Sequence, residues 1–271
     1  MTNSTVAPTL PAPPAGTSAT LPWVVVRIDQ KLFAFNSLVV REMVSIPKVR
    51  AVPDVPPHVR GVINLRGKAF TLVDLRVRLG FPSLAESTHT LEDLMKQREQ
   101  DHLRWVGELR ACVAERRAFT LTTDPHACAF GRWYDTFKTD NLLLNAVLRR
   151  FDEPHKYLHR TGKRIVDAMA KQEWDACAAM LHELESATLK TMVALFAETR
   201  EVLHDTSHEI AMVMATDVPF AVAVDAIEAV ERLKPVSTGD DPVVAVTDCV
   251  DAIAERPGGG LVLTLRHDRL V

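Results

Sequence analysis

The chain has 271 residues, of which 47% are hydrophobic and 25% charged, and its formal net charge is -3 at pH 7. This composition is typical of a globular protein with two compact domains and excludes a wholly disordered or collagen-like chain. The charge offers no basic field for nucleic acid, and no apolar run reaches the roughly 18 residues of a membrane span. Four scattered cysteines are too few for a disulfide framework. We therefore expect a cytoplasmic protein with no nucleic-acid partner and no membrane insertion.

The first part of the chain divides into a tail and a series of short strands. Residues 1–21 are uncharged and rich in Pro, Ala and Thr, so we expect a disordered tail there. Residues 22–90 contain runs rich in β-branched and aromatic side chains, separated by turn residues. These runs are WVVVRID, KLFAF, VVREMVSI, VRGVINL and KAFTLVDL. They predict a first β segment over 22–90.

A helical region begins near residue 91, where the period of the apolar residues changes. Apolar side chains recur every three to four residues, as on one face of an amphipathic helix. Thr90 and Asp152 are placed to cap two of the expected helices. Helices joined by short loops are typical of an antiparallel bundle, so we predict a four-helix bundle over 91–203.

Strand patterns return after the helical region. The runs EIAMVMA, FAVAVDAIEAVERL, PVVAV and LVLTL predict a second β segment over 206–271, with a loop from Pro235 to Pro242. The order of strands, helices and strands indicates an α+β protein in which a helical insert interrupts one β domain.

Four residues of the insert have the spacing of a metal site. They are His102, Cys128, His155 and His159, in the pattern H-x25-C-x26-H-x3-H. Residues four apart share one face of a helix, so the last two imidazoles can reach one ion. The histidines fall on the predicted apolar stripes, where an unpartnered imidazole loses its hydration without compensation. Three nitrogens and one thiolate suit tetrahedral Zn²⁺, which we predict as the cofactor.

Other interpretations of these side chains stay open at this point. Each histidine could be a hydrogen-bonded core residue, and a second pair with the same spacing, His204 and His208, has no cysteine partner and is interpreted as solvated. Four protein ligands would close the site and disfavour hydrolysis, whereas three would leave a position for water and allow a zinc hydrolase. The segment EPHKYLH lacks the H-E-x-x-H signature, and we assign no catalytic residue.

The segment VRGVINLRGKAFTLVDLRVRLGFP, residues 59–82, resembles the CheW-like domain of bacterial chemotaxis coupling proteins. The similarity continues upstream in VREMVSIPKV and downstream in HEIAMVM, FAVAVDAIEAV and LVLTLRHDRLV. It implies that both β segments form one CheW-like fold, a pair of small five-stranded β-barrels. The insert resembles the chemoreceptor zinc-binding (CZB) domain through His102, Trp105, the CAFGRW core and the HxxxH pair. That resemblance implies that the predicted four residues bind zinc.

The resemblance also implies a function. CheW-like proteins are scaffolds that connect the cytoplasmic tips of chemoreceptors to the CheA histidine kinase, so we expect a non-enzymatic adaptor whose insert senses zinc or oxidants. Glu42 and Arg66 match a Glu and Arg pair near the receptor-facing surface of the family, and Asn64 lies in the same matched motif. All three are expected to bind a partner. Their alternative interpretation is a surface salt bridge and a hydrogen bond at a strand end. The insert could also serve only for homodimerisation, with zinc in a structural role.

Overall fold

The computed structural model describes residues 21–237 and 248–271. Residues 1–20 of the expected tail and the run PVVAV lie outside the described residues. The chain divides into two compact units, Met1–Ser83 with Glu209–Val271, and Leu84–His208. We call them the β unit and the helical unit. No helix within the described residues combines the length and the apolar character that crossing a membrane requires.

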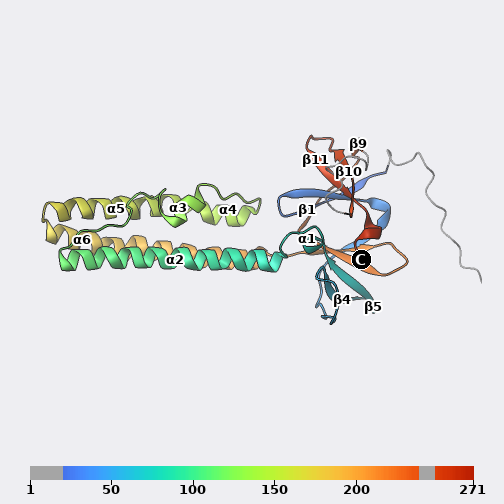
Figure 1. Ribbon diagram of the computed structural model, residues 1–271, viewed down its shortest axis with the longest axis horizontal. Helices are drawn as coiled ribbons and strands as arrows, with labels where there is room; N and C mark the ends of the chain where they lie inside the picture. The colour runs from blue at the N-terminus through green and yellow to red at the C-terminus, as the bar shows by residue number, and fades with distance from the viewer. Residues whose placement is uncertain (1–20, 238–247) are drawn as a thin grey trace, which may run out of the picture. The chain divides into compact units, whose positions relative to one another are not determined.

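The β unit contains two sheets, and each is built from strands of both β segments (Figure 1). The strands of the first segment are β1 (Trp23–Ile28), β2 (Lys31–Asn36), β3 (Val40–Ser45), β4 (Val59–Leu65) and β5 (Lys68–Asp74). Those of the second are β6 (Ile210–Met214), β7 (Phe220–Val224), β8 (Ala226–Glu231), β9 (Lys234–Ser237), β10 (Val250–Glu255) and β11 (Leu261–Leu265). Short helical turns are η1 (Ser37–Val39), α1 (Leu75–Arg78) and η4 (His267–Arg269).

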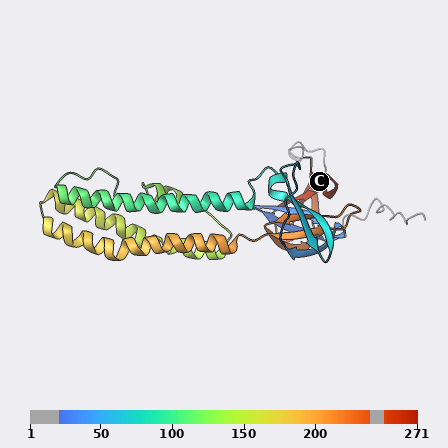
Figure 2. The same ribbon diagram turned by 90° about the horizontal axis from the view of Figure 1, so that it is seen from below.

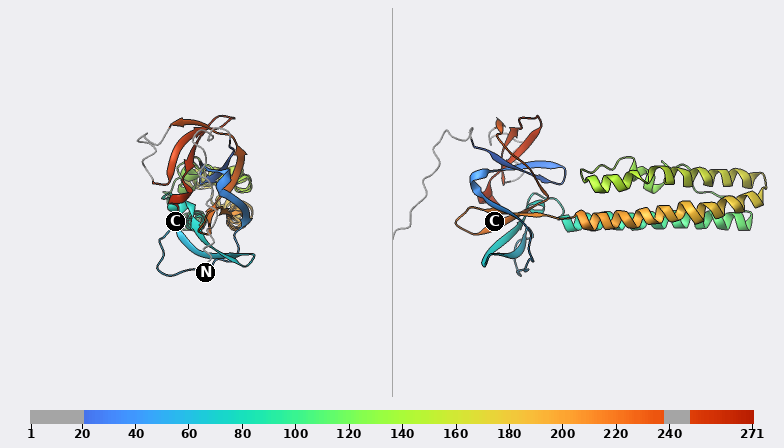
Figure 3. Two further views of the ribbon diagram at one scale, coloured as in Figure 1. Left: turned by 90° about the vertical axis from the view of Figure 1, so that its right-hand side faces the viewer. Right: turned by 180° about the vertical axis from the view of Figure 1, so that it is seen from behind.

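Each sheet takes strands from both segments of the chain. The six-stranded sheet has the order β8-β1-β2-β11-β10-β9, and the five-stranded sheet has the order β3-β6-β7-β5-β4. The two segments meet in two parallel pairs, β2 with β11 and β5 with β7, and in two antiparallel pairs, β1 with β8 and β3 with β6. The views in Figure 3 show the blue and teal strands of the first segment in the same unit as the orange and red strands of the second. The β segments therefore fold together as one unit.

The strand orders do not confirm the two closed five-stranded barrels that the family resemblance implies. One sheet has six strands, and neither order returns to its first strand within the described residues. A single bridge pairs Arg50, beyond the end of β3, with Val62 of β4, through hydrogen bonds of 2.9 and 2.8 Å. This bridge joins the two ends of the five-stranded sheet at one point without a continuous ladder. Pro235, expected in a loop, lies in β9.

The helical unit consists of two long helical runs and several shorter helices. The helices are α2 (Leu84–Glu115), α3 (Ala129–Tyr134), α4 (Leu142–Arg149), α5 (Asp152–Ala170), α6 (Trp174–Glu183) and α7 (Lys190–Thr206), with a π-helical turn, η2 (Leu184–Leu189), joining the last two. α2 packs along α7, and α5 packs against α6. Figure 2 shows the pairing of α2 with α7 from the side. Because α3 and α4 are short, this arrangement does not by itself confirm a bundle of four helices.

Two predicted helix starts are wrong. α2 begins at Leu84, so Thr90 lies within the helix, where its hydroxyl donates to the carbonyl of Glu86 at 2.8 Å. A threonine hydroxyl can bond the carbonyl one turn back, which satisfies it without a cap. Asp152 is the first residue of α5, and the capping position belongs to Phe151, which makes no side-chain cap. A carboxylate in the first turn still favours the positive end of the helix dipole.

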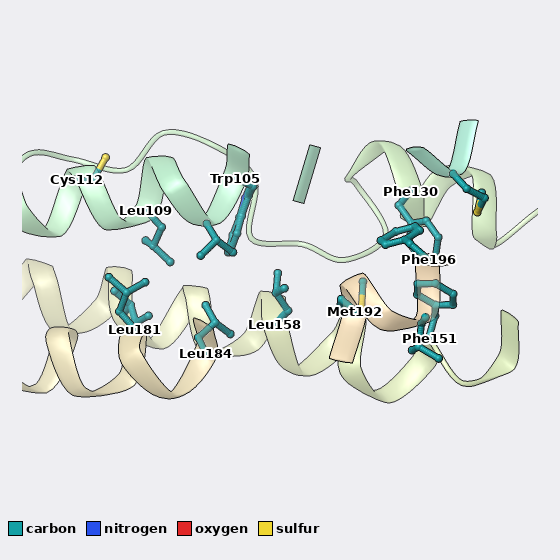
Figure 4. Packing of buried hydrophobic residues seen from close by; sticks show 14 of the residues in the cluster. Trp105, Leu109, Cys112, Phe130, Phe151, Leu158, Leu181, Leu184, Met192 and Phe196 are labelled. Carbon is teal, nitrogen blue, oxygen red and sulfur yellow. The ribbon is translucent and has the colours of Figure 1, made fainter. Parts of the chain in front are cut away.

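Aromatic side chains form the densest part of the helical core. Phe130, Phe151 and Phe196 lie together with ring centroids 4.8–5.4 Å apart (Figure 4). On α5, a Cβ at Gly162 would lie 2.2 Å from a ring carbon of Trp105, so only glycine lets α2 and its indole approach so closely. This packing fixes α2, α3 and α5 relative to one another, and all three carry or adjoin the predicted metal ligands.

Candidate metal centre

The structure brings the four predicted ligands together. One ligand atom from each of His102, Cys128, His155 and His159 lies within 4.8 Å of the others. We call this group the His/Cys cluster. His102 comes from α2, Cys128 precedes α3, and the other two lie on α5. The three histidines are buried, and Cys128 is partly exposed.

The two histidines of α5 face the same way because one helical turn separates them. Their ring centroids are 4.8 Å apart, and the ring of His102 lies 5.2 Å from His155 and 6.0 Å from His159. The Sγ atom of Cys128 lies 3.3 Å from Nε2 of His155. Two ligands on the same tetrahedral zinc ion, each about 2.0–2.3 Å from it, have a similar separation.

A tight turn positions Cys128. Cys128 is the N-cap of α3, and its Sγ accepts a hydrogen bond from the backbone N–H of Gly131 at 3.1 Å. A Cβ at Gly131 would lie 1.8 Å from the carbonyl oxygen of Pro125, so the turn closes only around glycine. Burial raises the pKa of the Cys128 thiol, although the N–H groups of Gly131 and Phe130 lower it in part. The start of α3 alone therefore does not favour a thiolate at Cys128, and a bound cation would be needed to favour it.

The backbone orients His102. Its Nδ1 lies 2.7 Å from the carbonyl oxygen of Arg98, one turn earlier on α2, so Nδ1 carries the proton and donates it. The other nitrogen, Nε2, is then an unprotonated acceptor. It is buried without a hydrogen-bond partner. Fixing one imidazole nitrogen through a backbone carbonyl is the usual way in which proteins present the other nitrogen to a metal.

The imidazoles of the cluster are neutral and incompletely satisfied. Burial and the neighbouring histidines lower the pKa of His155 to about 3, and burial and His102 lower the pKa of His159 to about 4. Burial also lowers the pKa of His102, despite its bond to Arg98. Neither ring nitrogen of His159 has a hydrogen-bond partner. Neutral imidazoles with buried, unpartnered nitrogens fit a metal ligand set, because a bound metal ion would give these nitrogens the partner that the protein does not provide.

The structure gives the three predicted partner residues local roles on the β unit. The guanidinium of Arg66, 84% exposed, lies 3.1 Å from a carboxylate oxygen of Glu42. Arg66 and Gly67 both have positive φ, at 52° and 84°, in the two-residue turn between β4 and β5. Oδ1 of Asn64 accepts a hydrogen bond from Gly67 N–H at 2.9 Å, which supports the turn. Their expected role in binding a partner stays a prediction.

The second histidine pair does not form a comparable site. His204 lies in the last turn of α7, whereas His208 lies beyond the end of that helix, and both are exposed. The other three cysteines, Cys112, Cys177 and Cys249, are buried, as expected for small apolar side chains. The sequence reasoning missed the carbonyl of Arg98, because a backbone group leaves no signal in the pattern of side chains.

Two families match different parts of the chain. Residues 22–99 match the CheW-like domain, and residues 102–166 match the chemoreceptor zinc-binding domain. A probable chemotaxis protein CheW from Rhizobium etli is 41% identical over 54 residues, and a chemotaxis protein CheW from Rhizobium meliloti is 39% identical over 62 residues. These alignments cover 20% and 23% of this chain and 35% and 39% of the two relatives. The chain therefore spans less than half of either relative.

One solved structure is similar over most of the chain. The scaffolding protein TtCheW from Thermoanaerobacter tengcongensis aligns with 91% of this chain and 88% of its own, with a TM-score of 0.40 and 12% sequence identity. A TM-score this low does not establish a common fold. The two family matches confirm the resemblance seen in the sequence.

Proposed function

We propose that this chain, which combines a CheW-like domain with a chemoreceptor zinc-binding domain, is a cytoplasmic, non-enzymatic adaptor that couples chemoreceptor tips to the CheA histidine kinase. The CheW-like part binds the partners, and the helical insert holds zinc and modulates the coupling. The two matched families and the names of the curated relatives support this assignment.

The convergence of the His/Cys cluster carries the proposal. Four donors that are far apart in the sequence meet within 4.8 Å, and two of the histidines keep unpartnered nitrogens there. Zinc would be held by Nε2 of His102, the sulfur of Cys128 and a ring nitrogen from each of His155 and His159, and it would supply a cross-link between α2, α3 and α5. Four donors fill a tetrahedral shell, which supports a binding protein over a hydrolase, since hydrolysis requires a position for water.

The place of the insert in the chain supports a modulating role. The helical unit enters after Ser83 and leaves before Glu209, so its ends continue into α1 on one side and β6 on the other. A change in helix packing caused by zinc binding, or by oxidation of the Cys128 thiolate, would reach the β unit through these two connections. Cys128 is the only oxidisable donor of the cluster.

Metal analysis tests the zinc site directly. The purified chain should contain about one zinc per molecule, as expected of one tetrahedral site. Alanine variants of the four cluster residues should lose it. His204→Ala is the matched control, because it removes an exposed histidine of the same helical unit and should keep the full zinc content. Zinc retained in the cluster variants, or absent from the wild type, would contradict the site.

Pull-down assays test the coupling role. The full chain should bind a chemoreceptor tip fragment and CheA, and Arg66→Ala and Glu42→Ala should weaken one of these interactions. Size-exclusion chromatography with and without a chelator separates this role from pure homodimerisation, in which zinc removal would change the oligomeric state but not the coupling. Failure to bind either protein would rule out the adaptor.

A Cys128→Ser variant tests the proposed switch. Serine does not ionise at neutral pH and is a poor zinc ligand, so the variant should lose zinc and change the kinase activity measured in the reconstituted complex. A variant with full zinc content and unchanged coupling would show that the thiolate is dispensable.

A further inference from the structure

A cavity of about 790 Å³ opens beside the His/Cys cluster. It lies between α2 and the chain that leads into α3, and three of the four cluster residues, His102, Cys128 and His159, line it. Trp105, Leu121 and other apolar side chains form much of the remaining wall. A volume of this size is within the range of small-molecule sites. The cluster is therefore buried against a space that a small molecule can enter.

One indole anchors the outer wall of this cavity. Nε1 of Trp105 donates a hydrogen bond to the carbonyl of Thr122 at 2.9 Å, and its ring meets the ring of Phe119 edge to face at 5.3 Å. Leu121 lies between these two anchor points and is 46% exposed. Contacts of Trp105 thus hold the chain on either side of Leu121, and Leu121 itself lines the cavity.

His159 places unpartnered ring nitrogens at the wall of the cavity. His159 is only 1% exposed, it lines the cavity, and both of its ring nitrogens lack a hydrogen-bond partner. When one nitrogen binds a metal, the other carries a proton and needs an acceptor. The adjoining cavity offers space for that acceptor, either water or a polar atom of an entering molecule.

We propose that this cavity is the passage through which small chelating molecules exchange the metal of the His/Cys cluster, and that Leu121 controls its entrance. The inference rests on the proposed zinc site. A chelating molecule would need space next to the residues that would hold the ion, and the cavity provides that space beside His102, Cys128 and His159. The rate of metal exchange then depends on free space in the cavity, whereas the affinity depends on the four donors.

Two substitutions at Leu121 test the passage in opposite directions. Leu121→Trp narrows the entrance and Leu121→Ala widens it, and neither removes a metal ligand or a hydrogen-bonding side chain. We would load the full chain with zinc and follow the rate of zinc transfer to the chromophoric chelator pyridylazoresorcinol. Transfer should be about tenfold slower in L121W than in L121A if cavity size limits access, with zinc affinity unchanged within about twofold. Gln100→Leu, an exposed position of α2, is the control and should match the wild type.

Alkylation of the metal-free chain provides a second measurement. The Cys128 thiolate displaces iodide from iodoacetamide and forms a thioether. Cys128 is partly exposed and lines the cavity, whereas the other three cysteines are buried and serve as internal references. The rate at Cys128 should follow the same order, fastest in L121A and slowest in L121W.

The two measurements separate this inference from the proposed function. Equal transfer rates and equal alkylation rates in both Leu121 variants would overturn the passage, even if the chain binds zinc. A wild-type chain that binds no zinc would instead overturn the metal site, and the alkylation series would still decide whether Cys128 is reached through the cavity.

Discussion

A polar cluster in the β unit and the His/Cys cluster in the helical unit differ in whether their buried polar atoms have hydrogen-bond partners. In the β unit, Arg60 donates from Nε to Asp74 at 2.7 Å and from its two terminal nitrogens to Glu209 at 2.5 and 2.8 Å. In the helical unit, His102 and His159 leave three buried ring nitrogens without a partner. A polar cluster whose members satisfy one another stabilises the fold, whereas an unsatisfied cluster costs stability until a ligand completes it. The contrast distinguishes a structural cluster from a binding site.

The ionic cluster of the β unit also joins the two segments of the chain. Arg60 belongs to β4, Asp74 ends β5 and caps α1, and Glu209 precedes β6, beyond the insert. Burial raises the pKa of Glu209, and the hydrogen bonds and charge of Arg60 counteract that rise. The Arg60 guanidinium therefore links Asp74, which precedes the insert in the chain, to Glu209, which follows it.

Zinc should produce the largest effect, and that effect should be greatest in the helical unit. At a free zinc concentration about 1,000 times Kd, binding adds about 4 kcal/mol to the free energy of unfolding of the unit that binds it. Hydrogen exchange of α2 and α5 should slow on zinc addition, and exchange in the strands of the β unit should change much less. If zinc slowed hydrogen exchange equally in both units, the contrast drawn between the two polar clusters would be contradicted.

Removing Arg60 should destabilise the other unit. Arg60→Met leaves the carboxylates of Asp74 and Glu209 without their partner, and we expect a loss of about 3 kcal/mol in a denaturant titration. Zinc content should not change. Arg266→Met, which breaks an exposed pair with Asp268, is the matched control and should cost less than about 1 kcal/mol. Similar losses in both variants would show that the Arg60 cluster is not structural.

A methyl group at Gly162 should loosen the helical unit. Its Cβ would lie 2.2 Å from the ring of Trp105, so Gly162→Ala should cost about 1–3 kcal/mol through overpacking, measured by thermal unfolding. A Cβ at Gly107 on α2 meets nothing within 4 Å, so Gly107→Ala should instead gain up to about 1 kcal/mol of helix propensity. A neutral G162A would mean that the indole moves aside freely.

The pH dependence of zinc affinity should correspond to the release of a single proton. The pKa values of His155 and His159, about 3 and 4, leave both imidazoles unprotonated near neutral pH, whereas burial keeps the Cys128 thiol protonated. Zinc binding then releases one proton, so affinity should rise about tenfold, or about 1.4 kcal/mol, per pH unit between about pH 6 and pH 8. Calorimetry in buffers of different ionisation enthalpy measures the protons released. Two or more released protons would show that a histidine is charged in the metal-free site.

Much of the organisation follows from local sequence patterns. Short apolar runs rich in valine locate the strands that contain Val25 and Val222. The apolar period of α5 places His155 and His159 on one face, since residues four apart in a helix are neighbours. The family resemblance adds both matched domains. The ends of helices were harder to predict from the sequence, because Thr90 forms its hydrogen bond within α2 and does not cap that helix.

The sequence by itself determined the order of strands and helices, the two domain families and the residue types suited to zinc, because these depend on short-range periodicity and local motifs. Only the tertiary structure decided that strands from both segments share each sheet, that four distant side chains meet within 4.8 Å, and that a cavity reaches three of them. These features depend on how packed helices and paired strands bring distant residues together, and the spacing of residues along the chain does not specify those contacts.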